Sequence, residues 1–212
     1  DVLSWYVMGE MQKFVSNFNS LGPYEAFKQT QMLNMLNTRY IVADETRPVL
    51  FNSEANGAAW FVKEVQSAKD ADEEITLLGN IDTKEVAIVD EQFAHLLPQT
   101  VSRDSSAYIS LESYSPNRLS YSVASNVDQV AVFSEIYYAD GWQAYLDDQP
   151  VEHFRTNYIL RGLTVPKGEH SIEFVFDPPS YKTGMWLSLI GSLALLLSFS
   201  VVMFMEFRKL EL

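Results

Sequence analysis

The stretch YYADGWQAYLDDQPVEHFRTNYILRGLTVPKGEHSIEFVFDP (Tyr137–Pro178) consists of short apolar runs separated by tight turns. The turns contain Asp140-Gly141, where glycine is free to take a positive φ angle, then Asp147–Pro150 and Pro166–Gly168. In the last run, HSIEFVF (residues 170–176), apolar residues at alternate positions give the strand one apolar face. Short strands at this spacing predict an antiparallel β-sandwich.

Strand patterns of the same kind continue upstream as far as residue 107. Residues that favour turns, such as Ser115-Pro116-Asn117, separate them. The expected strands cover residues 107–114, 118–125, 129–138, 142–146, 151–154, 158–165 and 170–176. We therefore assign residues 107–182 to an antiparallel β-sandwich-like region.

Residues 1–106 are expected to form a helical and mixed α+β region. Helical spacing of apolar residues predicts a first helix over Val2–Phe18, and a second is expected from Tyr24 to about Leu36. The stripe of the first helix comprises residues 7, 8, 11, 14, 15 and 18, and the buried candidates of the second are Phe27, Met32, Met35 and Leu36. Short strands are expected at 39–44, 48–51, 58–65 and 85–90. The predicted fold class is α+β.

The segment Asp70-Ala71-Asp72-Glu73 has the spacing of a capping box, which predicts a short helix ending near Gly79. A calcium site is the alternative interpretation of these acids. The calcium-loop pattern is missing, however, and acids at a helix start are already favoured by the helix dipole. We assign no metal and no cofactor to the chain.

A run of 22 residues without a charge, Gly184–Met205, follows the sandwich region. Its length suffices for a helix to cross the hydrocarbon core of a bilayer, and Trp186 suits the membrane–water interface. We expect a transmembrane helix over residues 183–207, with the lipid bilayer as partner, and a short cytoplasmic tail at 208–212.

The charges around this span predict its orientation. Arg208 and Lys209 lie close to its C-terminal end, where basic residues favour the cytoplasm, although Lys182 precedes it. Residues 1–183 contain 13 basic and 26 acidic residues. We expect this acidic part on the extracytoplasmic side.

The composition excludes several classes of function. A formal net charge of −13 argues against nucleic acid as a partner, because phosphates require a basic surface. The sequence contains no cysteine, which excludes disulfides, thiolate metal sites and a cysteine nucleophile.

No residue is assigned a catalytic role. Asp147 and Asp148 are adjacent, so their side chains would point in opposite directions on a strand, and acids are common in turns. His95, His153 and His170 show no spacing that suggests a catalytic set. A hydrolase anchored by its tail would need a nucleophile and a base, and no such pair is recognisable.

Aromatic residues around two of the turns, Trp142 and Tyr145 foremost, are candidates for carbohydrate binding. The alternative is that these rings fill the sandwich core, which we favour because large aromatic side chains are mostly buried. Trp142 would then pack against the apolar face of residues 170–176.

Three segments in order resemble the YfhO family of bacterial membrane proteins. They are MLNMLNTRYIV (32–42), NGAAWFVKEV (56–65) and the aromatic pair with Asp-Gly-Trp that leads to TNYILRGLTVPKGEHSIEFVFDP (156–178) and the span. The resemblance covers about residues 22–186.

This resemblance implies a large protein of the bacterial cytoplasmic membrane whose membrane part is similar to lipid-linked-sugar glycosyltransferases of the cell envelope. The catalytic carboxylate of such proteins belongs to an early extracytoplasmic loop, and nothing here matches it. Since the chain begins at Asp1 without a methionine, we expect it to be a piece of a longer protein. Its expected partners are upstream membrane helices of the same protein and a lipid-linked sugar or envelope polymer. The expected role is accessory to catalysis; the alternative is a non-enzymatic, membrane-tethered carbohydrate-binding or assembly module.

Overall fold

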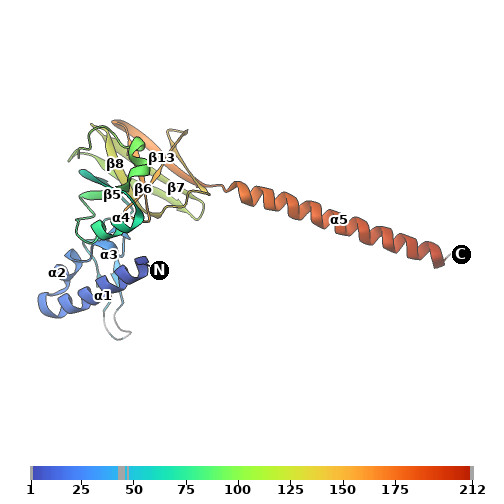
Figure 1. The fold of residues 1–212 in the computed structure, drawn as a ribbon, viewed down its shortest axis with the longest axis horizontal. Coiled ribbons are helices and arrows are strands. Elements are labelled where there is room, and N and C mark those ends of the chain that lie inside the picture. Colours follow the sequence, from blue (N-terminus) through green and yellow to red (C-terminus); the bar gives the residue numbers. More distant parts are fainter. Residues whose placement is uncertain (1, 43–45, 47, 211–212) are drawn as a thin grey trace.

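A computed structural model describes residues 2–42, 46 and 48–210 of the chain (Figure 1). The end of the strand expected at 39–44 and the last two residues of the expected tail lie outside the described residues. The helices are α1 (Val2–Leu21), α2 (Pro23–Lys28), α3 (Gln31–Met35), α4 (Ala71–Leu78), the 3₁₀ helix η1 (Glu91–Leu96) and α5 (Pro179–Leu210). The strands are β1 (Tyr40–Ile41), β2 (Leu50–Phe51), β3 (Ala59–Val62), β4 (Glu64–Ala68), β5 (Val86–Asp90), β6 (Tyr108–Ser115), β7 (Arg118–Ser125), β8 (Gln129–Ile136), β9 (Trp142–Leu146), β10 (Gln149–Val151), β11 (Phe154–Thr156), β12 (Leu160–Val165) and β13 (Gly168–Phe176).

Two sheets face each other and confirm the predicted sandwich. One has five strands in the order β10-β9-β13-β7-β6, and the other has six in the order β3-β8-β12-β11-β5-β4. Their pairings are antiparallel except for the parallel pair β4–β5. The core between them is built from alternate residues of both sheets: Phe61, Leu119, Tyr121, Val123, Ala131, Phe133, Ala144, Leu163, Val165, Ile172 and Phe174.

The second face of the six-stranded sheet is covered by helices. Met32 and Met35 of α3 and Ile75 and Leu78 of α4 are buried against residues of that sheet. The part of the chain that precedes α5, which we call the head, therefore has three layers. The same sheet takes β3, β4 and β5 from before residue 106 and β8, β11 and β12 from after it. The expected division at residue 106 therefore falls within one sheet.

The predicted N-cap of α4 is confirmed, but the box is incomplete, because Glu73 bonds the N–H of Lys69 and not that of the N-cap residue Asp70. The Asp70 carboxylate accepts the Glu73 backbone N–H at 2.9 Å, and the Glu73 carboxylate in turn accepts the Lys69 N–H at 2.9 Å. The helix ends at Leu78, with Gly79 as its C-cap. These acids have a structural reason for their positions.

The N-terminal helices differ in detail from their predicted ranges. Of the apolar stripe on α1, Phe14 is buried, whereas Met8 and Val15 are 60% and 56% exposed. The helix expected at 24–36 is two helices, because Thr30 leaves the helical region at φ −112° and ψ 69°. Its hydroxyl donates to the Phe27 carbonyl, which offers the backbone an alternative to a continuous helix.

Helix α5 follows β13 after two residues and leaves the head as a single straight helix (Figure 1). Residues Pro179–Met205 are long and apolar enough to cross a membrane and are not buried by the rest of the chain. The helix begins earlier than the predicted 183, because its first turns contain polar residues that the charge-free run did not include.

The β9–β10 turn is fastened to β13 by a histidine–carboxylate pair. Asp147 and Asp148 both have positive φ angles, 49° and 63°, as in tight hairpin turns. The Asp147 carboxylate accepts the Ser171 backbone N–H at 2.8 Å and lies 2.6 Å from Nδ1 of His170. Asp147 and His170 therefore have a structural role at this hairpin.

We predict that His170→Gln lowers the free energy of unfolding at about pH 5.5 and has little effect at about pH 9. The hydrogen bond to Asp147 raises the pKa of His170 above 6.5. Its contribution is therefore complete below the unfolded pKa and is lost as the pH rises through the folded pKa. Urea unfolding of the unmodified chain and of the variant, both in detergent micelles, measures the difference in stability at each pH. An equal loss at both pH values would contradict a charged pair.

Candidate functional site

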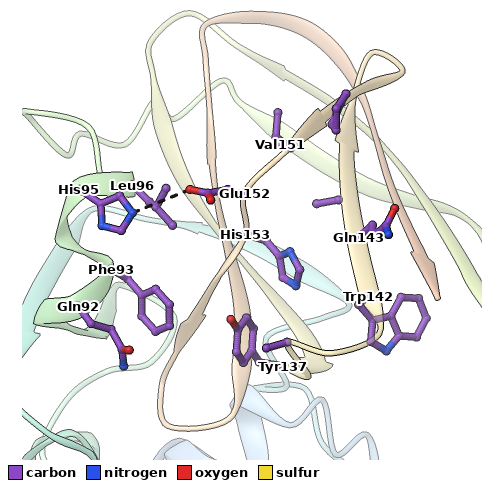
Figure 2. Close-up of a pocket in the computed structure, with 13 residues that line it drawn as sticks. Gln92, Phe93, His95, Leu96, Tyr137, Trp142, Gln143, Val151, Glu152 and His153 are labelled. Atoms are coloured by element: carbon purple, nitrogen blue, oxygen red, sulfur yellow. Dashed lines mark ion pairs between the residues drawn. The ribbon is translucent and has the colours of Figure 1, made fainter. Parts of the chain in front are cut away.

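An open cleft of about 540 Å³ lies at one edge of the sandwich (Figure 2). One wall of the cleft is η1, and the opposite wall comprises the start of β9 and the end of β10. The β8–β9 loop lies at one end of the cleft. Figure 2 shows His153 between these walls, with Phe93 and His95 on one side and Trp142 on the other.

The cleft exists because the chain changes sheets at this point. Strand β10 belongs to the five-stranded sheet and β11 to the six-stranded sheet, so the link Glu152-His153 crosses from one to the other. Both residues of the link line the cleft. The sequence pattern predicted one strand at 151–154, which was wrong because no local signal marks a change of partner strand.

Aromatic rings form much of the cleft lining. The ring of Phe93 contacts that of Tyr137 edge-on at 6.0 Å, and Tyr137 contacts the His153 ring at 5.3 Å. Trp142 lines the same cleft beyond them. Aromatic faces with polar edges suit a surface that binds partly hydrated ligands.

Trp142 is half-buried, so the prediction that it would be largely buried in the core holds only in part. It faces inward, but it pairs with Phe176 at the end of β13, whereas the fully buried Ala144 pairs with Phe174. Its ring lies 5.3 Å from that of Phe176, and the Arg161 guanidinium lies 4.0 Å from the indole centroid. Trp142 thus combines a packed position with an edge in the cleft.

The turn before Trp142 requires glycine for a reason other than the one expected. Gly141 is not among the residues with positive φ. A Cβ atom at this position would collide with the ring of Phe176. Gly141 therefore permits the close approach of Phe176, which in turn supports Trp142.

Tyr145, the second carbohydrate candidate, does not line the cleft. Its hydroxyl donates to the Gln143 side chain at 2.7 Å. Side chains alternate along a strand, so Tyr145 points to the face opposite Trp142. The structure therefore does not bring Trp142 and Tyr145 together.

Arg161 lies beneath Trp142 and was missed by sequence reasoning. It is 1% exposed, its Nε donates to the Ile136 carbonyl at 3.0 Å, and its Nη1 has no hydrogen-bond partner. Burial lowers its pKa, and the nearby charge of Glu135 opposes that shift. A lone arginine inside the apolar run YILRGLTV was the available signal.

His153 provides an unpaired polar atom at the cleft. Its Nε2 is buried without a hydrogen-bond partner. Burial, assisted by the positive charge of Arg161, lowers its pKa to about 4. The ring is therefore neutral near neutral pH, and it lines the cleft as an uncharged aromatic side chain.

Exposed polar side chains line the mouth of the cleft. They include the amides of Gln92 and Gln143 and the pair His95–Glu152, whose Nε2 and Oε2 lie 3.9 Å apart. Within the described residues, no group of three or more metal-ligating side chains was found. The lining can stack against a flat apolar surface and exchange hydrogen bonds with hydroxyl groups.

Comparison with known proteins identifies the family. The model of the family described as bacterial membrane protein YfhO matches residues 19–188. The uncharacterized protein YfhO of Bacillus subtilis (strain 168) is 24% identical over 115 residues, which cover 54% of this chain and 13% of that protein. The matched part is thus a small fraction of the relative's length. Since the family match covers most of the chain, the chain belongs to the YfhO family of bacterial membrane proteins.

Proposed function

We propose that residues 1–183 form an extracytoplasmic saccharide-binding module, accessory to a glycosyltransferase-like membrane part of the same protein. The observation that carries the proposal is the cleft at the β10–β11 crossover. It combines the rings of Phe93, Tyr137 and Trp142 with the exposed side-chain amides of Gln92 and Gln143.

The chemistry of this lining suits a sugar. A pyranose ring has an apolar C–H face, which packs on aromatic rings, and a rim of hydroxyls, which require donors and acceptors. The volume of about 540 Å³ lies within the usual range for small-ligand sites.

The cleft supports binding rather than bond cleavage. The described residues that line it include no serine, threonine, cysteine or lysine. His95 and Glu152 are both exposed, so neither is held in the dry, fixed geometry that acid–base catalysis favours. We infer that donor activation takes place elsewhere in the longer protein.

The proposed location is the bacterial cytoplasmic membrane, with α5 as anchor and the head outside the cytoplasm. The support comes from the apolar span and from Arg208 and Lys209 beyond it. An acceptor polymer or lipid-linked sugar on that side of the membrane could then reach the cleft.

We expect Trp142→Ala to weaken glycan binding at least about tenfold, equivalent to about 1.4 kcal/mol. Tyr108→Ala, exposed on β6 and outside the cleft, should bind like the unmodified chain. An array of bacterial envelope oligosaccharides identifies a ligand, and titration of the chain in micelles gives the affinities.

Trp142→Ala also removes packing, so Glu152→Gln and Gln143→Ala provide a separate test, because both side chains are exposed at the cleft mouth. Weaker glycan binding by these variants would support the cleft as the saccharide-binding site. An array without ligands, or unchanged affinity in all three cleft variants, would overturn the proposal. Binding that has no influence on sugar transfer by the longer protein would favour a tethered, non-enzymatic module.

A further inference from the structure

The end of the sandwich nearest α5 exposes large aromatic side chains. Tyr114 of β6, Tyr138 of the β8–β9 loop and Phe176 of β13 are exposed there, and Tyr181 and Trp186 are exposed on the first turns of α5. We name these five residues the aromatic collar. A group of exposed large apolar side chains at one end of a molecule is typical of an interaction surface.

Strand register places the three sandwich members of the collar at the same end. Tyr114 pairs with Leu119, which pairs with Phe174, two residues before Phe176. The Phe176 N–H donates to the Asn117 carbonyl at 2.9 Å, which holds the β6–β7 turn at this level. The ring of Tyr138 lies 6.5 Å from that of Phe176. The collar members therefore lie at the end of the sandwich where α5 begins.

The dimensions of a bilayer put this point within the headgroup layer. The charge-free run Gly184–Met205 extends over about 33 Å as a helix, close to the ~30 Å hydrocarbon core. Residues 179–183 add roughly 7 Å, similar to the headgroup layer of one leaflet.

The link between the head and α5 is short and fixed. Only Asp177 and Pro178 separate β13 from α5, and the Asp177 N–H donates to the Gly141 carbonyl at 2.9 Å. The nearby cations are paired: Lys182 with Asp177 at 2.5 Å, and Arg118 with Glu173 at 2.8 Å. Such a link cannot hold the head far above the membrane.

We propose that the aromatic collar seats this end of the sandwich in the headgroup layer of the bilayer. Tyrosine and tryptophan are enriched at this depth because the ring is apolar and its edge is polar. The partner that covers the aromatic collar is thus the surface of the same bilayer that α5 enters.

Seating the collar also sets the position of the saccharide cleft. A second hollow of about 540 Å³, lined by Tyr138, Trp142, Asp177 and the first residues of α5, adjoins the cleft. Trp142 lines both. A saccharide attached to a membrane lipid could therefore reach the cleft from the bilayer side; this consequence rests on the proposed saccharide binding, whereas the seating rests only on α5 as the membrane anchor.

Because the chain contains no cysteine, single-cysteine variants can be labelled without background. Tyr114→Cys and Tyr138→Cys carry an environment-sensitive fluorophore, and the full chain is reconstituted in phosphatidylcholine vesicles containing headgroup spin-labelled lipid. The matched control is Tyr108→Cys, because Tyr108 is 54% exposed at the other end of β6. Tyr181→Cys is the positive control.

We expect quenching at positions 114 and 138 to be about threefold stronger than at 108, since six strand residues separate 108 from 114 by roughly 20 Å. Quenching at both positions no stronger than at 108, with 181 quenched, would overturn the seating. Glycan binding in detergent micelles involves no bilayer. A failure to bind glycan there would therefore count against the saccharide site and not against the seating of the collar.

Discussion

Replacing Phe174 by alanine is expected to lower the free energy of unfolding by about 3–5 kcal/mol, the usual loss for a fully buried phenylalanine. Phe174 is 0% exposed and lies at the centre of the sandwich core. Its ring makes edge-on contacts with Phe133 at 4.9 Å, Tyr121 at 6.2 Å and His153 at 5.7 Å. Truncation would therefore leave a cavity that both sheets border. Chemical denaturation of the full chain in detergent micelles measures the change.

Phe176→Ala is the matched control, since it removes the same ring from the same face two residues further along β13. Phe176 is 36% exposed, so less apolar surface returns to water, and we expect a loss of about 1–2 kcal/mol. Equal losses at the two positions would contradict the register of β13 in the core.

Arg161→Ala is expected to destabilise the head by about 3 kcal/mol, because truncation of a large buried side chain leaves a cavity. The guanidinium lies 4.0 Å from the indole centroid of Trp142 and 5.1 Å from the ring centroid of Phe174. The same denaturation measurement applies. Trp142 would lose its support, so its indole fluorescence should also shift towards that of a solvated ring.

Arg161→Met separates packing from charge. Methionine fills much of the same volume and carries no buried charge, so the stability should lie within about 1 kcal/mol of the unmodified chain. If Met costs as much as Ala, the charge of Arg161 stabilises the fold, and packing beneath Trp142 does not account for the loss. If Ala costs nothing, Arg161 is not buried as described.

The strands could be predicted well from the sequence because their signals are local. Alternation with period two and turn residues such as Asp147-Asp148 located most strands of the sandwich to within a few residues. The single strands expected at 58–65 and 151–154 are each two strands in the structure. The N-cap at Asp70 likewise depends on four consecutive residues and was confirmed. Resemblance in short motifs also predicted the family, which the match over 19–188 confirms.

The assembly of the sheets could not be predicted in this way. Strand β3 pairs with β8, about 70 residues later, and Thr156 of β11 pairs with Val89 of β5. Such pairings depend on the whole core rather than on a local pattern. The division at residue 106 therefore could not anticipate that one sheet contains strands from both sides of it.

The cleft depended on the same non-local information. Trp142 was identified as a candidate from its residue type and turn. His153 lines the same cleft because the chain crosses between sheets after β10, and Arg161 contacts the Trp142 ring because the two sheets pack face to face. Tyr145 was grouped with Trp142 because the two are close in sequence, although an odd separation on a strand places them on opposite faces.

Saccharide binding beside Trp142 can be observed directly through the indole N–H signals of the chain, labelled with ¹⁵N-tryptophan and studied in micelles. Trp142→Phe assigns the Trp142 signal. Trp60 is an internal control, because it is buried and its indole N–H donates to the Thr83 carbonyl at 2.9 Å. Titration with the oligosaccharide selected by the array should shift the Trp142 signal saturably and leave that of Trp60 unchanged. A bound oligosaccharide that leaves the Trp142 signal unmoved would contradict a saccharide site in this cleft.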